Sequence, residues 1–208
     1  MNPASIGFIT GLTAEAALLK NTPFMVGVGG GTPQGAAGAA QQLIGQGVLA
    51  LISFGLAGGL NPHLAPGTII IPRYINHAAC DVGLTNWLGG ATHERIYAGD
   101  AIAITAAEKL QAHHTHRADA VDLESGAVAE IAARLGVPFA ALRAIADPAT
   151  RTLPPAALIA LNAAGQIKPM PILWSILQNP SQVPKLIALA NDAIRARKSL
   201  VLKLKTLS

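Results

Sequence analysis

Short apolar runs alternate with helically spaced stretches along most of this chain. The runs that predict buried strands are residues 6–9, 24–28, 48–54, 68–71, 95–98, 120–123 and 139–145. The stretches that predict helices are residues 13–19, 33–44, 106–114 and 125–135. Residues 55–62 are glycine-rich and predict a turn, and residues 74–90 predict an irregular segment. This order predicts a single α/β domain over residues 1–208, with a mixed central sheet flanked by helices.

The ends of the predicted strands carry the first candidates for a site, because ligands of such sheets bind outside the carboxyl ends of the strands. The residues just after strands are Glu15, the segment Gly29-Gly30-Gly31-Thr32, residues 56–59, Glu124 and Asp147.

The segment Gly29-Gly30-Gly31-Thr32 precedes a predicted helix, which Thr32 can cap while Pro33 takes the first helical position. A dinucleotide fingerprint is excluded, because its third glycine would fall on Thr32 and no acid follows at the required spacing. Two interpretations stay open. The backbone N–H groups could face an anion, or the glycines could form a tight turn without a ligand.

Charged residues gather around the last two predicted strands. Asp122, Glu124, Arg143 and Asp147 all lie at or near strand ends, where a charge is costly unless it is paired or used. Taken singly, structural roles are favoured. Glu124 could complement a helix dipole, and Asp147, before Pro148, could belong to a turn.

Composition narrows the class of protein. The chain has 208 residues, with 51% apolar and 4% aromatic residues, as in a close-packed α/β fold. From Lys185 onward there are six cations and one anion, against nine cations and ten anions before it. The basic charge therefore belongs to the end of the chain, and we expect no nucleic-acid partner.

Several other classes of function find no support. Cys80 is the single cysteine, so no intramolecular disulfide and no cysteine-rich metal site is expected. His113, His114 and His116 do not converge on one helical face, and we expect no metal site. Glycines interrupt the long uncharged stretch before Arg73, which argues against a membrane span. The first residues lack the basic region of a secretion signal, which predicts a cytoplasmic protein.

The region from residue 121 to 149 closely resembles the purine and uridine phosphorylase superfamily, above all its methylthioadenosine and adenosylhomocysteine nucleosidases. The family's V-E-M-E-A-x-A, V-P-F and R-A-I-S-D motifs correspond to residues 121–127, 137–139 and 143–147. Further matches are Gly11-Leu12-Thr13-Ala14-Glu15, the turn at residues 54–60 and Ala98-Gly99-Asp100.

The resemblance implies an enzyme that cleaves the bond between a purine, here adenine, and ribose. It implies that Asp147 protonates the purine as general acid, that Glu15 activates the nucleophile, and that Arg143 is their electrostatic neighbour. Glu124 would accept hydrogen bonds from the ribose hydroxyls. The other residues that it implies for substrate binding are Asp122, Leu123, Leu56, Ala57, Gly58, Ile102 and Ala103.

The nucleophile stays open between water and inorganic phosphate, and no other cofactor is expected. Leu56 and Ala146 replace two serines of the nucleosidases, which removes polar contacts for water. Phosphate would need an anion site, for which residues 29–32 with Arg143 are the candidates. The arginine that phosphorylases place before the glycine-rich turn is missing. The missing arginine argues against phosphate, but the loss of the two serines weakly leans the prediction towards it.

The end of the chain resembles a subgroup named hopanoid-associated phosphorylases, which are thought to release adenine from adenosylhopane. The resemblance rests on residues 152–158 and 177–193, and it implies an apolar 5′ substituent. Residues 183–208 also predict a basic amphipathic helix, which either covers the sheet or contacts the inner face of a membrane. The family further implies a homo-oligomer.

Three alternatives remain beside this prediction. The first is a methylthioadenosine or adenosylhomocysteine nucleosidase. The others are a catalytically inactive nucleoside-binding protein, which would not need Glu15 and Asp147, and a membrane-associated protein, which would leave the acids unexplained.

Overall fold

Successive side chains of the central strands alternate between two apolar layers. Phe8 and Ile52 belong to one buried cluster, whereas their neighbours Ile9 and Leu51 belong to the other. A strand buried on both faces reads as a continuous apolar run, which is why the sequence pattern located these strands. The computed structural model describes residues 3–99, 103–158 and 169–207, and in it both layers enclose one sheet.

The sheet is mixed. β1, β2, β3 and β9 run parallel, β4 pairs antiparallel with β9, and the end of β3 pairs antiparallel with β8. β7 pairs parallel with β8 and β5, and β6 completes that edge. The strands are β1 (Ile6–Thr10), β2 (Met25–Val28), β3 (Ala50–Gly59), β4 (Ile69–Ile70), β5 (Pro72–Ile75), β6 (Ala78–Ala79), β7 (His93–Ala98), β8 (Ala120–Asp122) and β9 (Phe139–Asp147).

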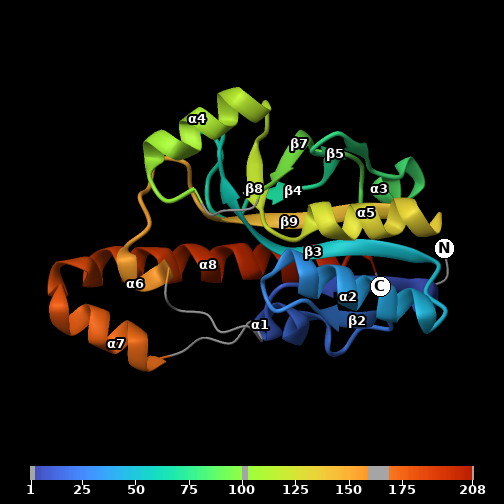
Figure 1. The fold of residues 1–208 in the computed structure, drawn as a ribbon, viewed down its shortest axis with the longest axis horizontal. Coiled ribbons are helices and arrows are strands. Elements are labelled where there is room, and N and C mark those ends of the chain that lie inside the picture. Colours follow the sequence, from blue (N-terminus) through green and yellow to red (C-terminus); the bar gives the residue numbers. More distant parts are fainter. Residues whose placement is uncertain (1–2, 100–102, 159–168, 208) are drawn as a thin grey trace.

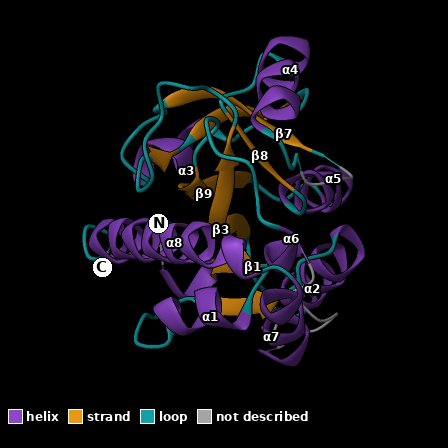
Figure 2. Cartoon of the chain, turned by 90° about the vertical axis from the view of Figure 1, so that its left-hand side faces the viewer, coloured by secondary structure: helices purple, strands orange, loops and turns teal. Residues whose placement is uncertain are grey.

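Helices cover both faces of the sheet, and Figure 2 shows α8 on one side of β3 and β9, with α2 and α5 on the other. Figure 1 shows α6 and α7 beside the N-terminal part of α8. The helices are α1 (Thr13–Ala16), α2 (Pro33–Gly45), α3 (Val82–Trp87), α4 (Ala106–His116), α5 (Ser125–Leu135), α6 (Pro155–Leu158), α7 (Pro169–Gln178) and α8 (Val183–Leu204). Short 3₁₀ turns occupy Pro3–Ser5, Ala17–Leu19 and Pro180–Gln182. The predicted fold class is confirmed.

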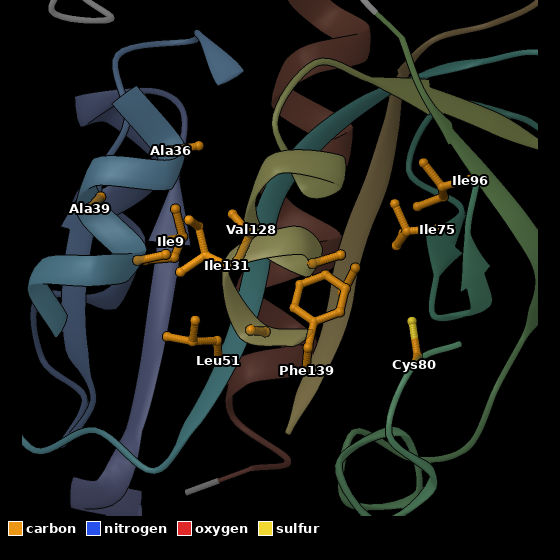
Figure 3. Close-up of a cluster of buried hydrophobic side chains, with 14 of the residues drawn as sticks. Ile9, Ala36, Ala39, Leu51, Ile75, Cys80, Ile96, Val128, Ile131 and Phe139 are labelled. Carbon is orange, nitrogen blue, oxygen red and sulfur yellow. The ribbon is translucent and has the colours of Figure 1, made fainter. Parts of the chain in front are cut away.

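One core lies under α2 and α5. Figure 3 shows Ile9 and Leu51 of the sheet packed with Val128 and Ile131 of α5, and with Ala36 from α2 on the same side. The small alanines of α2 and α5 let both helices approach the sheet closely. The opposite core is formed with α8, which buries Ala196, Leu200 and Leu204.

The glycine-rich segment after residue 54 is not a turn, contrary to the sequence prediction. β3 continues to Gly59 and pairs with β9 and β8. At Gly55 a Cβ atom would lie 2.6 Å from Oε1 of Glu15 and 2.8 Å from Nη1 of Arg143. Glycine is therefore needed here because side chains approach the strand closely, not because the chain turns.

Other boundaries also differ from the prediction. β9 extends to Asp147, so this acid ends a strand and is not a turn residue. The segment expected to be irregular contains the end of β5, β6 and α3, whose first turn is capped by Asp81. The predicted terminal helix is α8, and its buried face covers the sheet. Within the described residues, no helix is both long enough and apolar enough to cross a bilayer.

Candidate active site

A cavity of about 310 Å³ lies where β3, β8 and β9 end. Its lining combines acids from distant parts of the chain with apolar side chains. The lining residues are Leu12, Glu15, Gly31, Leu56, Ala57, Gly58, Ala103, Lys109, Val121, Asp122, Leu123, Glu124, Ala146, Asp147 and Leu153.

Glu15 enters the cavity from α1, which begins directly after β1, and its side chain is held by backbone groups. Its Oε2 accepts hydrogen bonds from the N–H groups of Gly11 at 3.1 Å and Leu12 at 2.9 Å. Its Oε1 accepts one from the N–H of Leu56 at 2.8 Å. The carboxylate is thus fixed by three donors, none of which depends on the side chain of Leu56.

Arg143 lies in the middle of β9, completely buried beneath the cavity floor, and is surrounded by acceptors. Its Nε lies 2.9 Å from Oδ2 of Asp122, and its Nη2 donates to Oε2 of Glu124 at 3.2 Å. Nη2 also donates to the hydroxyls of Ser53 at 2.6 Å and Ser125 at 3.1 Å. A buried cation is tolerated only with such partners, and here the guanidinium holds the two acids in place around it.

Asp122 and Glu124 flank the start of α5 but have different tasks. Oδ1 of Asp122 accepts the N–H groups of Glu124 at 3.0 Å and Ser125 at 2.9 Å, so Asp122 satisfies the helix start. Glu124 stands at the N-cap position but makes no capping hydrogen bond through its side chain. Its carboxylate instead accepts a hydrogen bond from Arg143 and lines the cavity, so the helix-dipole explanation does not account for its placement.

Burial is the main reason why the pKa of Glu124 is raised, to about 7. Arg143 lowers it, and the charges of Asp122 and Glu15 raise it. The carboxylate also requires a glycine opposite it. A Cβ atom at Gly11 would lie 1.9 Å from Oε1 of Glu124.

Asp147 ends β9 and is paired with Lys109 of α4. The ammonium of Lys109 donates to Oδ2 of Asp147 and to the carbonyl oxygens of Pro148 at 3.2 Å and Arg151 at 2.7 Å. Oδ1 of Asp147 is buried and has no hydrogen-bond partner among the described residues. Desolvation raises the pKa of Asp147, although Lys109 and Arg151 act against it. A carboxyl group that retains its proton can donate it to a ligand.

The cavity brings together most of the residues selected from the sequence. Those that line it are Glu15, Leu56, Ala57, Gly58, Ala103, Asp122, Leu123, Glu124 and Asp147. Arg143 lies behind them, and Ile102 lies outside the described residues.

The predicted anion segment reaches the cavity only through Gly31. Thr32 caps α2, since its hydroxyl accepts the N–H of Gly35 and donates to the carbonyl of Gly29. Gly29 itself packs against α2, where a Cβ atom would lie 2.7 Å from Cα of Ala36. These contacts account for Gly29 and Thr32 without a ligand.

Sequence reasoning missed Lys109, Leu12, Val121 and Leu153 as lining residues. Lys109 is the one buried residue of α4, in a helix where charged and histidine side chains are otherwise common. The chain offers no local signal for its role, because its partners lie 38 or more residues further on. Within the part of the chain that the structure describes, no group of three or more His, Cys, Asp or Glu residues could hold a metal ion.

The family follows from comparison with known sequences. The model of the phosphorylase superfamily matches residues 7–91 and 88–157. The chain therefore belongs to the phosphorylase superfamily, which confirms the sequence prediction of an enzyme of the nucleoside phosphorylase and nucleosidase type. No curated protein gives a significant match.

Solved structures share the fold over nearly the whole chain. An S-adenosylhomocysteine nucleosidase from Streptococcus pyogenes, in complex with 5-methylthiotubericidin, is 17% identical with a TM-score of 0.68 and covers 100% of this chain and 99% of its own. A 5′-methylthioadenosine/S-adenosylhomocysteine nucleosidase from S. pneumoniae, with a transition-state inhibitor, is 18% identical with a TM-score of 0.67 and coverages of 98% and 99%. A futalosine hydrolase of Helicobacter pylori is 14% identical with a TM-score of 0.68 and coverages of 97% and 96%.

Proposed function

We propose that this protein releases adenine from a nucleoside with an apolar 5′ substituent by cleaving the N-glycosidic bond. The observation that carries the proposal is the convergence of Glu15, Glu124 and Asp147 on one cavity, from three elements far apart in the chain. The superfamily and the nucleosidases that share the fold support the same reaction.

Asp147 is the residue that protonates the leaving purine. Cleavage leaves negative charge on the base, which a proton on its N7 neutralises, and Asp147 is the acid with a raised pKa and an unpartnered oxygen. The alternative of an inactive binding protein gives no reason to keep this group.

Glu124 is the residue that binds the ribose hydroxyls. Its carboxylate can accept two hydroxyl hydrogen bonds, and Arg143 holds it in place from behind. The positive charge that develops on the ribose during cleavage would be stabilised by Glu124 and Glu15, which flank Gly11.

The charges of the site favour water as the nucleophile, which reverses the expectation of phosphate drawn from the sequence. Arg143 is surrounded by Asp122 and Glu124, and Lys109 is paired with Asp147, so neither cation is left for an anion. Glu15 keeps its three N–H donors without the serine that Leu56 replaces. A carboxylate held in this way can orient a water molecule and take its proton.

The apolar 5′ substituent is inferred from the lining of the cavity. Leu12, Leu56 and Leu153 supply large aliphatic side chains beside the acids. Such a wall favours an alkyl or alkylthio group over a charged one, as expected for adenosylhopane and for methylthioadenosine alike.

The test is to supply adenosine and a series of 5′-alkylthioadenosines of increasing chain length, with and without phosphate. We expect free adenine and ribose derivatives without phosphate, and a specificity constant that rises with alkyl length. Adenine release that requires phosphate and yields ribose 1-phosphates would overturn the choice of water. No adenine release from any of these nucleosides would refute the function.

The predicted membrane contact and the homo-oligomer stay predictions. Ala196, Leu200 and Leu204 of α8 are buried against the sheet, whereas Ile187, Ile194 and Leu202 are exposed, as is Lys198. If this face meets anionic lipid, Ile187→Ser with Ile194→Ser should abolish flotation with phosphatidylserine vesicles at low salt. Leu49→Ser, which changes an exposed leucine outside α8, should leave flotation unchanged. A parent protein that does not float contradicts the contact.

A further inference from the structure

Lys109 is a buried lysine that no part of the proposed chemistry uses so far. It lies in α4, whose other described residues are exposed or half-buried, and it is the residue that ties this helix to the end of β9. Lysine is rarely buried without a specific partner, because removing its charge from water is costly.

The three N–H groups of the Lys109 ammonium match three acceptors. One is Oδ2 of Asp147, and the others are the carbonyl oxygens of Pro148 and Arg151. An ammonium group has three donors and no acceptor, so this set saturates it. Lys109 therefore acts on a substrate through Asp147 and not by a hydrogen bond of its own.

The pairing also distinguishes the two oxygens of Asp147. Oδ2 is occupied by Lys109, whereas Oδ1 has no partner among the described residues. We propose that Lys109 is a positioning residue for the proposed general acid, whose ammonium fixes Oδ2 so that Oδ1 is the oxygen that carries the proton to the purine. This inference rests on the proposed function of Asp147.

The charges around Asp147 predict a measurable consequence. Burial raises its pKa most, Lys109 of α4 and Arg151 of the loop after β9 lower it, and Asp192 of α8 raises it. Arg151 is shared, because it also pairs with Asp192. Removing Lys109 takes away the cation in direct contact, so the pKa of Asp147 should rise further. Since the acid must hold its proton, turnover should then persist to higher pH.

The experiment compares the kcat–pH profiles of the parent, Lys109→Met and Lys109→Gln, using saturating nucleoside. We expect the alkaline limb of both variants to move upward by about 1–3 pH units, because an adjacent opposite charge shifts a carboxyl pKa by that amount. We also expect the plateau value of kcat to fall at least about tenfold, because the acid is less well oriented. Lys198→Met removes an exposed lysine and should leave the profile unchanged.

Lys109→Gln guards against loss of folding, since its amide can still donate to the two carbonyl oxygens while it lacks the charge. Thermal melting identifies any variant that does not fold. A folded variant whose alkaline limb stays at the parental pH overturns the proposal.

The double variant Lys109→Met with Asp147→Asn separates this inference from the function itself. If Lys109 acts through Asp147, its removal should cost less than about threefold once Asp147 is changed, because the effects of coupled residues are not additive. Fully multiplicative losses refute the coupling. If Asp147→Asn is inactive but Lys109→Met keeps the parental profile, only the role of Lys109 fails. If Asp147→Asn remains fully active, the proposed function of Asp147 fails instead.

Discussion

The change Asp147→Asn tests the chemical step most directly, because the structure indicates how the new side chain would sit. Lys109 offers only donors, so the oxygen of the new amide should take the place of Oδ2, and its NH₂ group should lie at the position of Oδ1. A hydrogen bond to the purine could then form, but no proton could be transferred. Binding should therefore change little, while kcat should fall by roughly two to four orders of magnitude.

This loss corresponds to about 3–5 kcal/mol of transition-state stabilisation, since each factor of ten is 1.36 kcal/mol. The assay follows adenine release at saturating nucleoside, and substrate affinity is measured separately by calorimetry. Glu130→Gln, which changes an exposed acid of α5, is the control. A variant that keeps more than about a tenth of the parental kcat would refute the assignment of Asp147 as the proton donor.

Three further changes probe the ribose side of the cavity. Glu124→Gln should lower the preference for ribosides over 2′-deoxyribosides, and an unchanged ratio of specificity constants would contradict the ribose contact. Because the pKa of Glu124 is raised to about 7, the acceptor carboxylate is lost as pH falls below 7. KM should therefore rise from pH 8 to pH 6 in the parent and stay flat in Glu124→Gln. In Gly11→Ala, the new Cβ would displace Glu124, whose Oε1 lies 1.9 Å away, so kcat/KM should fall about a hundredfold with little change in Tm. A parental kcat/KM would show that Glu124 moves without consequence.

The central strands could be predicted because burial on both faces leaves a plain mark in the sequence. Runs such as 6–9 and 48–54 are almost entirely apolar, and glycine or a capping residue marks where the helices beside them begin or end. The short strands β5 and β6 at one end of the sheet and helix α3 show no such pattern in the sequence. They are partly exposed, and their residues satisfy neither period clearly.

The glycines of residues 55–59 show why local rules can mislead. A glycine-rich segment is most often a turn, yet Gly55 lies within a strand. Residue 55 is a glycine because Glu15 and Arg143 occupy the space that a side chain would need. That contact joins residues 40 and 88 positions away, which no local pattern contains. The same limit applies to Lys109, whose partner is known only once β9 and α4 are placed together.

Glu15, Glu124 and Asp147 differ in their surroundings, and under the proposed function this difference allows one site to carry acid and base chemistry together. Glu15 accepts three backbone N–H bonds, which suit a carboxylate that orients a nucleophile. Glu124 shares the buried guanidinium of Arg143 and titrates near neutral pH. Asp147 is desolvated and held on one side by Lys109, which suits a group that retains a proton. Carboxyl groups in equal surroundings would compete for the same proton, whereas these environments favour the proposed roles of Asp147 at the base and of Glu15 and Glu124 on the ribose side.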